Sequence, residues 1–422
     1  MRKTDCPASA TRSWIVTLVF ATLLLCLMLV HSRHWQDTVS AALLCILAMA
    51  AVNFGLDTLV LKVYARPETG LDWQRKSPSW ERTWLKFLGL LASLAFVGGL
   101  YWLFPEYKGT FYHEYWIFLR RILPWWLALA APYFYFSDAR QTRPEDGYYQ
   151  MGLAVSGQFR KVDRASLWQH VLGWLVKGYF MPLMFTYFTR DLGALIAYNF
   201  SSIQSFRVFF DFGYDSVFLI DVGFCCVGYL MSLRVFDTHL RWAEPTLKGW
   251  VVALFCYEPF WSFFSKQYLE FSRDYAWGTW LHDLPVLYVL WGSMILVLVG
   301  IYVWATIMFG CRFSNLTHRG ILTNGPYRWT KHPAYISKNL AWWMISVPFI
   351  VSDSLLDSAR RSVLLLFLNL IYFLRARTEE AHLSRDPAYV RYAEWIRENG
   401  LFRWLKRGGA RNSDRQAAGD QR

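Results

Sequence analysis

The chain has 422 residues, of which 55% are hydrophobic and 19% aromatic, yet its formal net charge is +13. Charged residues make up 18%, less than the roughly 25% of soluble domains, and the apolar residues form long blocks. This composition excludes a disordered chain, a collagen-like fibre and a disulfide scaffold. It does not indicate a nucleic-acid partner, because membrane proteins also concentrate Lys and Arg, in their cytoplasmic loops.

The apolar blocks predict an all-α, polytopic integral membrane protein. A bilayer core about 30 Å thick needs roughly 20 apolar residues per helix, because each backbone group must pair internally. The last two blocks are short and close together, which predicts a tight helical hairpin. In chain order, the ten predicted spans are 14–30, 41–61, 84–104, 122–136, 167–188, 217–233, 250–264, 285–308, 339–351 and 363–374.

The distribution of basic residues predicts the orientation of these spans. With a cytoplasmic N-terminus, the inner segments hold 32 of the 44 Lys and Arg residues and the outer loops hold 10. This asymmetry follows the positive-inside rule. We therefore expect a multi-pass protein with both termini in the cytoplasm, located in a bacterial inner membrane. The first span could instead be a signal peptide, but no Ala-x-Ala cleavage pattern follows it, which favours a retained helix.

We expect three regions along the chain. Residues 1–283 form an N-terminal helical membrane region of about seven spans, for which the sequence indicates no role. Residues 284–407 form a C-terminal core with a reentrant motif, the hairpin and an amphipathic helix near residues 392–406. Residues 408–422 are small, polar and charged, as in a disordered tail.

Charged side chains inside apolar spans are candidates for function, since burying them is costly. The early spans hold Asp57, Lys177, Asp221 and Glu258, and Pro259 after Glu258 predicts a kink in that helix. They could contact a substrate, or pair with one another for structural reasons, and the second reading is favoured. The seven cysteines are odd in number and show no Cys-x-x-Cys spacing, so we expect no disulfide framework and no metal site.

The densest polar sequence flanks the predicted hairpin. It reads GPYRWTKHPAY over 325–335 and RARTEEAHL over 375–383. Gly325-Pro326 predicts a turn, and Pro333 after His332 predicts a second bend. Arg375 and Glu379 are four residues apart, so they share one helix face, whereas Arg377 and Glu380 are expected to point elsewhere. The hairpin would bring the two clusters together.

These two motifs, in this order and spacing, resemble the isoprenylcysteine carboxyl methyltransferase family and its phospholipid methyltransferase relatives. The first is similar to the family's G-x-Y-x-x-x-R-H-P-x-Y. The second is similar to its R-x-x-x-E-E-x-x-L and Tyr-rich end, here Tyr389 and Tyr392. The resemblance covers the last quarter of the chain. It implies a membrane-embedded methyltransferase that binds S-adenosylmethionine from the cytoplasmic side and acts on a lipidic or amphiphilic substrate.

The resemblance also implies roles for individual residues. Arg375 would orient an acidic substrate such as a carboxylate. Asn339, which is not part of the family pattern, would add a polar group near the substrate entry, and both residues are predicted as catalytic. Glu379 would hold the ribose or the ammonium group of the cofactor. The complete predicted cofactor-binding set is Ile321, Leu322, Tyr327, His332, Pro333, Ala334, Tyr335 and Glu379.

The chain departs from the family pattern at two places. Lys331 replaces the usual Arg before His-Pro, which keeps the charge but loses the planar fork. Ser337, Lys338 and Asn339 replace the small and aromatic residues that commonly follow the motif, so a prenylcysteine substrate does not follow from the resemblance. Membrane lipids are the expected partners, and no nucleic acid is expected.

Two other functions are compatible with the sequence. An NADPH-dependent oxidoreductase of the sterol-reductase kind has a similar C-terminal architecture, but HPAY and RARTEE are closer to the methyltransferase motifs. A transporter or scaffold would use Lys177, Asp221 and Glu258 to line a polar path, but neither internal repeats nor paired broken helices are visible in the sequence.

Overall fold

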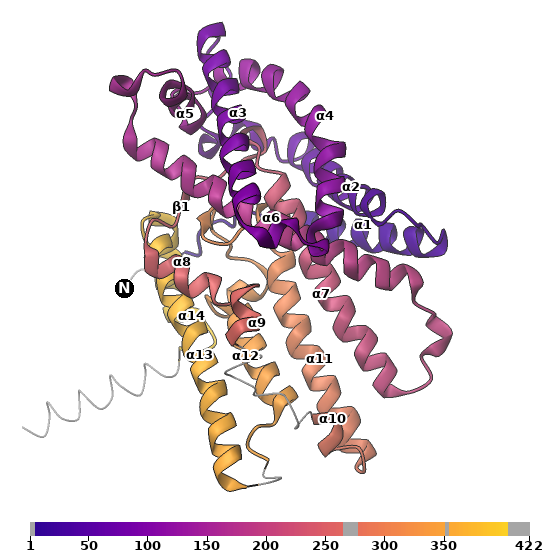
Figure 1. Cartoon of the computed structure of the whole chain (residues 1–422). Coiled ribbons are helices and arrows are strands. Elements are labelled where there is room, and N and C mark those ends of the chain that lie inside the picture. Colours follow the sequence, from indigo (N-terminus) through magenta and orange to yellow (C-terminus); the bar gives the residue numbers. More distant parts are fainter. Residues whose placement is uncertain (1–4, 265–276, 351–353, 404–422) are drawn as a thin grey trace, which may run out of the picture. The chain divides into compact units, whose positions relative to one another are not determined.

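A computed structural model describes residues 5–264, 277–350 and 354–403, and 74% of the structure is helical (Figure 1). The predicted all-α class is confirmed. The chain forms two compact units. The first unit consists of Met1–Ser13, Val251–Met308 and Gly320–Arg422, as far as these are described, and the second of Trp14–Trp250 and Phe309–Arg319. The predicted region boundaries at 283 and 407 stay predictions, and residues 408–422 lie outside the described part.

Seven α-helices and one small sheet build the second unit. The helices are α1 (Ser13–Ser32), α2 (Thr38–Leu59), α3 (Trp80–Leu103), α4 (His113–Asp138), α5 (Gly147–Val155), α6 (Arg164–Ala197) and α7 (Phe206–Leu230). Strands β1 (Trp242–Ala243) and β2 (Thr317–His318) pair antiparallel, with Trp242 opposite His318. The connections contain the 3-10 helices Val63–Ala65, Pro67–Thr69, Pro105–Lys108, Thr110–Tyr112, Phe159–Lys161, Phe200–Ser202, Arg234–Phe236 and Gly310–Arg312.

The first unit carries both sequence motifs. After α8 (Leu247–Leu254), whose last residues belong to this unit, its elements are α9 (Phe260–Phe264), α10 (Trp277–Trp280), α11 (Pro285–Ile307), a 3-10 helix at Gly325–Arg328, α12 (Pro333–Ser346), α13 (Leu355–Leu383) and α14 (Pro387–Asn399). Helices α12 and α13 run antiparallel, since Trp343 bonds Asn369 near one end and Tyr335 bonds Glu379 near the other. The predicted hairpin is therefore present.

The helices begin where the sequence offers a capping side chain. Asp37, Ser79, Asp146, Asp163 and Ser205 precede α2, α3, α5, α6 and α7, and each side chain accepts a hydrogen bond from a backbone N–H of the first turn. These N–H groups have no partner inside the helix. The caps therefore fix where each apolar run starts as a helix.

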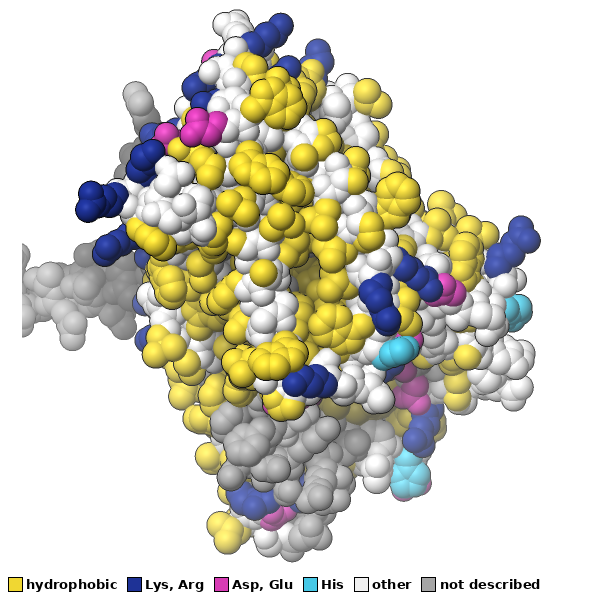
Figure 2. All heavy atoms as spheres, turned by 45° about the horizontal axis from the view of Figure 1, so that its top comes forward, with side chains coloured by type: hydrophobic (Ala, Val, Ile, Leu, Met, Phe, Trp, Pro, Cys, Tyr) yellow, Lys and Arg dark blue, Asp and Glu magenta, His cyan; other side chains and the backbone are white. Residues whose placement is uncertain are grey.

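In the part of the chain that the structure describes, α1, α2, α3 and α11 are long and apolar enough to cross a membrane. They coincide with four of the predicted spans. Five other predicted spans also fall largely on helices, on α4, α6, α7, α12 and α13, but that these cross a membrane stays a prediction. Figure 2 shows hydrophobic side chains over much of one face, and exposed residues such as Met28 at 68% and Trp125 at 70% are typical of lipid-facing helices.

The predicted span 250–264 is wrong as a continuous helix. Helix α8 ends at Leu254 and α9 begins at Phe260. Pro259 lacks a backbone N–H donor and restricts Glu258 before it, which disfavours a continuous helix at this point. The sequence predicted a kink here, and the structure has a complete break.

Two glycines allow α3 and α5 to touch at backbone distance. A Cβ atom on Gly89 would lie 2.0 Å from the backbone oxygen of Tyr148, and one on Gly152 would lie 2.0 Å from that of Leu85. Any larger residue would force the helices apart. This contact brings the start of α5 beside the first turns of α3, where a charged side chain is buried.

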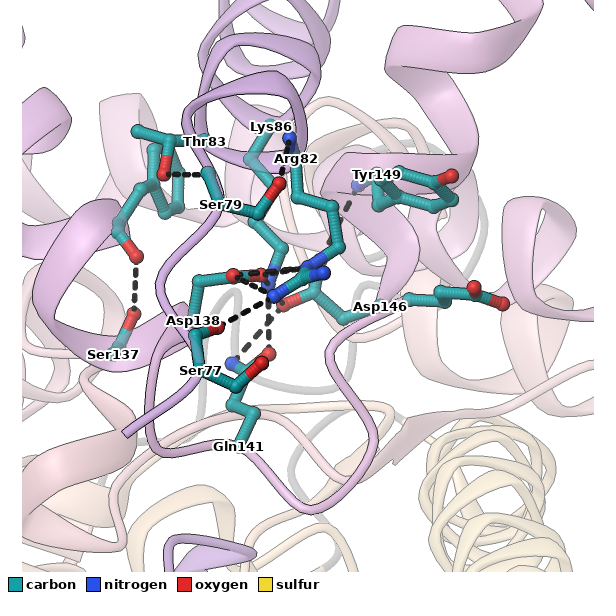
Figure 3. A network of polar contacts seen from close by, with 12 residues as sticks. Ser77, Ser79, Arg82, Thr83, Lys86, Ser137, Asp138, Gln141, Asp146 and Tyr149 are labelled. Atoms are coloured by element: carbon teal, nitrogen blue, oxygen red, sulfur yellow. Dashed lines mark hydrogen bonds and ion pairs between the residues drawn. The ribbon is translucent and has the colours of Figure 1, made fainter. Parts of the chain in front are cut away.

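That side chain is Lys86, which is fully buried in α3 (Figure 3). Its Nζ atom lies 3.0 Å from Asp138 and 3.1 Å from Asp146, and it donates a hydrogen bond of 2.7 Å to the Oε1 atom of Gln141. Arg82 contacts the other oxygen of Asp138 at 2.9 Å. The buried ammonium therefore has two carboxylates and an amide around it, and it ties α3 to the connection between α4 and α5.

A second buried cation fixes loops of the same unit. Arg319 donates hydrogen bonds to the backbone oxygens of Gly228 at 2.6 Å, Phe313 at 3.0 Å, Met231 at 3.1 Å and Thr238 at 2.7 Å. Five donors in a planar fork suit such a set of carbonyls. The segment 309–319 is thereby fixed against the end of α7 and the loop that follows it.

We predict that Lys86→Met destabilises the protein by about 3 kcal/mol, because Asp138 keeps Arg82 but loses its fully buried partner. Lys76→Met, at an exposed position, is the matched control. Equilibrium unfolding in detergent measures both. Equal stability of the two variants would show that the Lys86 network contributes nothing.

Candidate functional site

The first motif forms an irregular loop between α11 and α12. The predicted turn at Gly325-Pro326 is present: Gly325 has a φ of +56°, and a Cβ there would lie 2.6 Å from Met308. Both the left-handed backbone and the close contact require glycine. Tyr327 follows in the 3-10 helix, and its backbone oxygen accepts a hydrogen bond of 2.7 Å from the hydroxyl of Tyr392 on α14.

The start of α12 aims the imidazole of His332 at α13. His332 occupies the N-cap position, and Pro333 is buried at the first helical position, where its missing N–H costs nothing. The His332 Nε2 atom lies 2.9 Å from Glu380 Oε1, and its ring stacks on Tyr335 with the centroids 5.5 Å apart and the planes at 5°. Lys331 contacts the same carboxylate oxygen at 2.6 Å.

The prediction that Glu380 points away from the site is therefore wrong. One residue along a helix is a rotation of about 100°, so Glu380 lies beside the face that carries Arg375 and Glu379. The motif loop bends far enough around α13 for Lys331 and His332 to meet Glu380. The sequence signal for this contact was the adjacent Glu pair, of which only the first was assigned a role.

The environment of Glu380 favours its ionised form. Burial acts to raise the pKa of this carboxyl group, but hydrogen bonds from His332 and Lys331 and the charge of Lys331 outweigh it, and the pKa falls from 4.5 to about 2. Glu380 is thus an anion at neutral pH, engaged by two side chains of the motif loop.

Glu379 differs from its neighbour. Its Oε2 atom accepts a hydrogen bond of 2.9 Å from the hydroxyl of Tyr335, and it lies 3.9 Å from His332 Nδ1. Its side chain is 40% exposed, whereas that of Glu380 is 19% exposed. Of the two carboxylates, Glu379 is the one with room to meet a ligand.

Arg375 lies on the same face as Glu379, as the spacing predicted. Its guanidinium carbon lies 5.3 Å from the ring centroid of Tyr335 and 5.4 Å from that of Tyr257, and Nη2 donates a hydrogen bond of 3.3 Å to the Tyr257 hydroxyl. Planar stacking on aromatic rings is a property of Arg that Lys lacks. Tyr257 is a site residue that the sequence analysis missed, because it lies far from both motifs in the chain.

Asn339 takes part in a polar relay across the hairpin. Its Nδ2 atom donates a hydrogen bond of 2.7 Å to the backbone oxygen of Tyr335, and its Oδ1 atom accepts one of 2.6 Å from Asn369. Asn369 in turn accepts a hydrogen bond of 2.7 Å from the indole N–H of Trp343. Polar side chains pair across helices where water is scarce. Asn369 was also missed, although a lone Asn in the apolar run LLLFLNLIYF was a visible signal.

Among the other members of the predicted set, Ile321 and Tyr327 pack with residues of α14. Ile321 is buried with Tyr389 and Tyr392, and Tyr327 packs against this cluster. Leu322 is buried next to it in sequence, and Ala334 is half-buried in the first turn of α12. The structure thus joins His332, Tyr335, Asn339, Arg375 and Glu379 by polar and ring contacts, and Ile321 and Tyr327 by packing with Tyr389 and Tyr392.

The charged residues predicted inside the early spans are described within their own units. In the second unit, Asp57 accepts a hydrogen bond of 2.7 Å from Asn53, Lys177 lies 6.0 Å from the ring centroid of Trp174, and Asp221 is buried in α7. Glu258 belongs to the first unit, where it accepts hydrogen bonds from Ser262. Local pairing accounts for Asp57 and Glu258.

Glu380 should contribute stability that depends on pH. Its folded pKa lies below the ordinary 4.5, so the contribution is complete above pH 4.5 and is lost as the pH falls towards about 2. The difference corresponds to at most about 3 kcal/mol at neutral pH. We expect Glu380→Gln to be less stable than wild type at pH about 7, with a gap that narrows towards pH about 3. Denaturant unfolding across this range measures it, with Glu394→Gln on α14 as the control. A gap that does not change with pH would contradict the assignment.

Comparison with known proteins gives one match. Residues 286–385, which contain both motifs, match the model of the Isoprenylcysteine carboxyl methyltransferase (ICMT) family. No curated protein and no solved structure matches the chain. The resemblance inferred from the two motifs is therefore confirmed: this C-terminal region is similar to a family of membrane methyltransferases.

Proposed function

We propose that the protein is a membrane-embedded methyltransferase that uses S-adenosylmethionine, bound from the cytoplasmic side, to methylate a lipidic or amphiphilic acceptor. The observation that carries the proposal is the juxtaposition, within the matched region, of an exposed carboxylate, a ring-stacked guanidinium and a stacked His–Tyr pair at one end of the hairpin.

The donor set suits the proposed cofactor. S-adenosylmethionine supplies a methyl group on a sulfonium and presents an ammonium, a carboxylate and a ribose. Glu379 offers an acceptor for the ribose or the ammonium, and the rings of His332 and Tyr335 offer π faces that attract a cation. Ile321, Leu322 and Tyr327 supply apolar surface, and Pro333 and Ala334 line the first turn of α12.

For the acceptor, we propose that Arg375 and Asn339 position a polar or acidic group. The guanidinium of Arg375 contacts the rings of Tyr257 and Tyr335, and these contacts restrict the orientation of its side chain. Methyl transfer requires an in-line approach more than proton transfer. Positioning and exclusion of water are then the contributions of these side chains.

The proposed cytoplasmic location is supported by contacts within the first unit. The hydroxyl of Thr11 donates 2.8 Å to the backbone oxygen of Met308, and Asn324 donates 3.2 Å to the backbone oxygen of Thr11. Residues 5–13 therefore lie beside Met308 and Asn324, as they must if the N-terminal segment and the motif loop face the same side of the bilayer.

We expect wild-type protein to bind S-adenosylmethionine in detergent, and Glu379→Gln to weaken binding at least about tenfold, which is 1.4 kcal/mol. The neutral amide keeps the size of the side chain but loses the anion. Calorimetric titration measures this, with Glu394→Gln as the control. Absence of heat with wild type would contradict the proposal, and tighter binding of NADPH would favour a reductase instead.

We expect Arg375→Lys to retain cofactor binding but lose methyl transfer, by about 10²-fold, because a lysine cannot stack between two rings or donate as a fork. Arg377→Lys is the matched control, since Arg377 is two residues away on α13 and 67% exposed. Transfer of labelled methyl groups to lipids extracted from native membranes is the readout. Equal transfer by both variants would show that Arg375 does not position the acceptor.

A further inference from the structure

A short N-terminal segment is hydrogen-bonded along the motif loop. We name residues 5–13 the N-terminal arm. The backbone N–H of Ala10 donates 2.9 Å to the backbone oxygen of Ile321, and the N–H of Thr323 donates 3.2 Å to the hydroxyl of Ser9. The Thr323 hydroxyl donates 2.9 Å to the backbone oxygen of Pro7. These bonds join residues more than three hundred positions apart in the chain.

Asn324 continues this pairing. Its Oδ1 accepts 3.0 Å from the Ser9 hydroxyl, and its Nδ2 donates 3.2 Å to the backbone oxygen of Thr11 and 3.2 Å to the hydroxyl of Ser13. The next residue is Gly325, where the chain turns into the His-Pro motif. The loop residues bonded to the arm therefore reach up to Asn324, directly before the turn of the motif.

The loop segment 321–324 is held from two directions. Its backbone bonds the arm, whereas the side chain of Ile321 packs against Tyr389 and Tyr392 of α14. Tyr392 also bonds the backbone oxygen of Tyr327 at 2.7 Å. A loop with no regular secondary structure of its own acquires a single conformation from these contacts.

The arm lies outside the part of the chain that matches the family, which begins at residue 286. It carries few apolar side chains with which to pack, and Ala8, Arg12 and Ser13 are exposed. Its interaction with the loop is therefore mainly through backbone and hydroxyl hydrogen bonds, whose effect is to fix geometry rather than to bury apolar surface.

We propose that the N-terminal arm is a strap that holds residues 321–324 in the conformation that binds the cofactor, with Ser9, Ala10 and Thr11 as positioning residues. The proposal rests on the proposed function. An ordered loop loses little conformational entropy when a ligand binds, whereas a released loop must be ordered at that moment, which lowers affinity.

The test replaces one backbone donor. Ala10→Pro removes the N–H that bonds Ile321, while Ala8→Pro introduces the same ring two residues away at an exposed position. In full-length protein in detergent, titrated with S-adenosylmethionine, we expect Ala10→Pro to raise the Kd at least about tenfold and Ala8→Pro to change it less than about twofold.

A second pair of variants covers the case in which Ala10→Pro does not fold. Thr11→Val loses the hydroxyl that bonds the backbone oxygen of Met308, whereas Thr11→Ser keeps it. The strap predicts weaker binding for Thr11→Val and recovery in Thr11→Ser. Amide hydrogen exchange should be faster at 321–324 in Thr11→Val and unchanged in the helices of the second unit, which a general loss of stability would not produce.

The outcomes separate the two proposals. If wild type does not bind S-adenosylmethionine, the proposed function is wrong, and so is the proposal that the arm is a strap. If wild type binds and Ala10→Pro matches Ala8→Pro, or Thr11→Val matches Thr11→Ser, the strap is wrong and the function stands. Tighter binding by Ala10→Pro would also overturn the proposal, because the arm would then compete with the cofactor.

Discussion

The candidate site depends on the ion pairs of Glu380. This carboxylate contacts Lys331 at 2.6 Å and His332 at 2.9 Å, and so joins the motif loop to the last turns of α13. Without it, Lys331 would lose this carboxylate partner, and His332 would keep the longer contact of 3.9 Å with Glu379. Because Glu380 satisfies His332 and Lys331, the neighbouring Glu379 remains available to a ligand. The two adjacent carboxylates therefore have different roles because they differ in exposure and in partners.

Apolar helices leave few places for polar groups, and this constraint shapes both units. A charge in an apolar environment must be surrounded by compensating groups. In the second unit, Lys86 is surrounded by Asp138, Asp146 and Gln141, and Arg319 by backbone carbonyls. In the first unit, the same requirement is met at the end of the hairpin. There the compensation includes aromatic rings, which hold Arg375 while leaving its charge able to attract an anion.

The sequence predicted helix positions well because apolar runs are local signals. It predicted the hairpin and the shared face of Arg375 and Glu379 for the same reason. The sequence did not predict side-chain contacts between segments that are far apart in the chain. The contact of Glu380 with Lys331 and His332 depends on how the loop bends around α13, and that of Tyr257 with Arg375 depends on packing across more than a hundred residues. The break between α8 and α9 was underestimated because a proline in a helix can cause either a kink or an end.

The motif loop shows that a short sequence motif does not by itself determine the shape of a site. Residues 321–332 have only one 3-10 turn of regular structure, so their shape must come from contacts made outside the loop. Those contacts include the N-terminal arm, Tyr392 of α14 and Glu380 of α13. Each bonds a different stretch, so losing one would release part of the loop and leave the rest in place. Cofactor binding and acceptor positioning can therefore depend on different contacts. The arm bonds residues 321–324 and not the charged motif residues, so its loss should change the affinity for the cofactor alone.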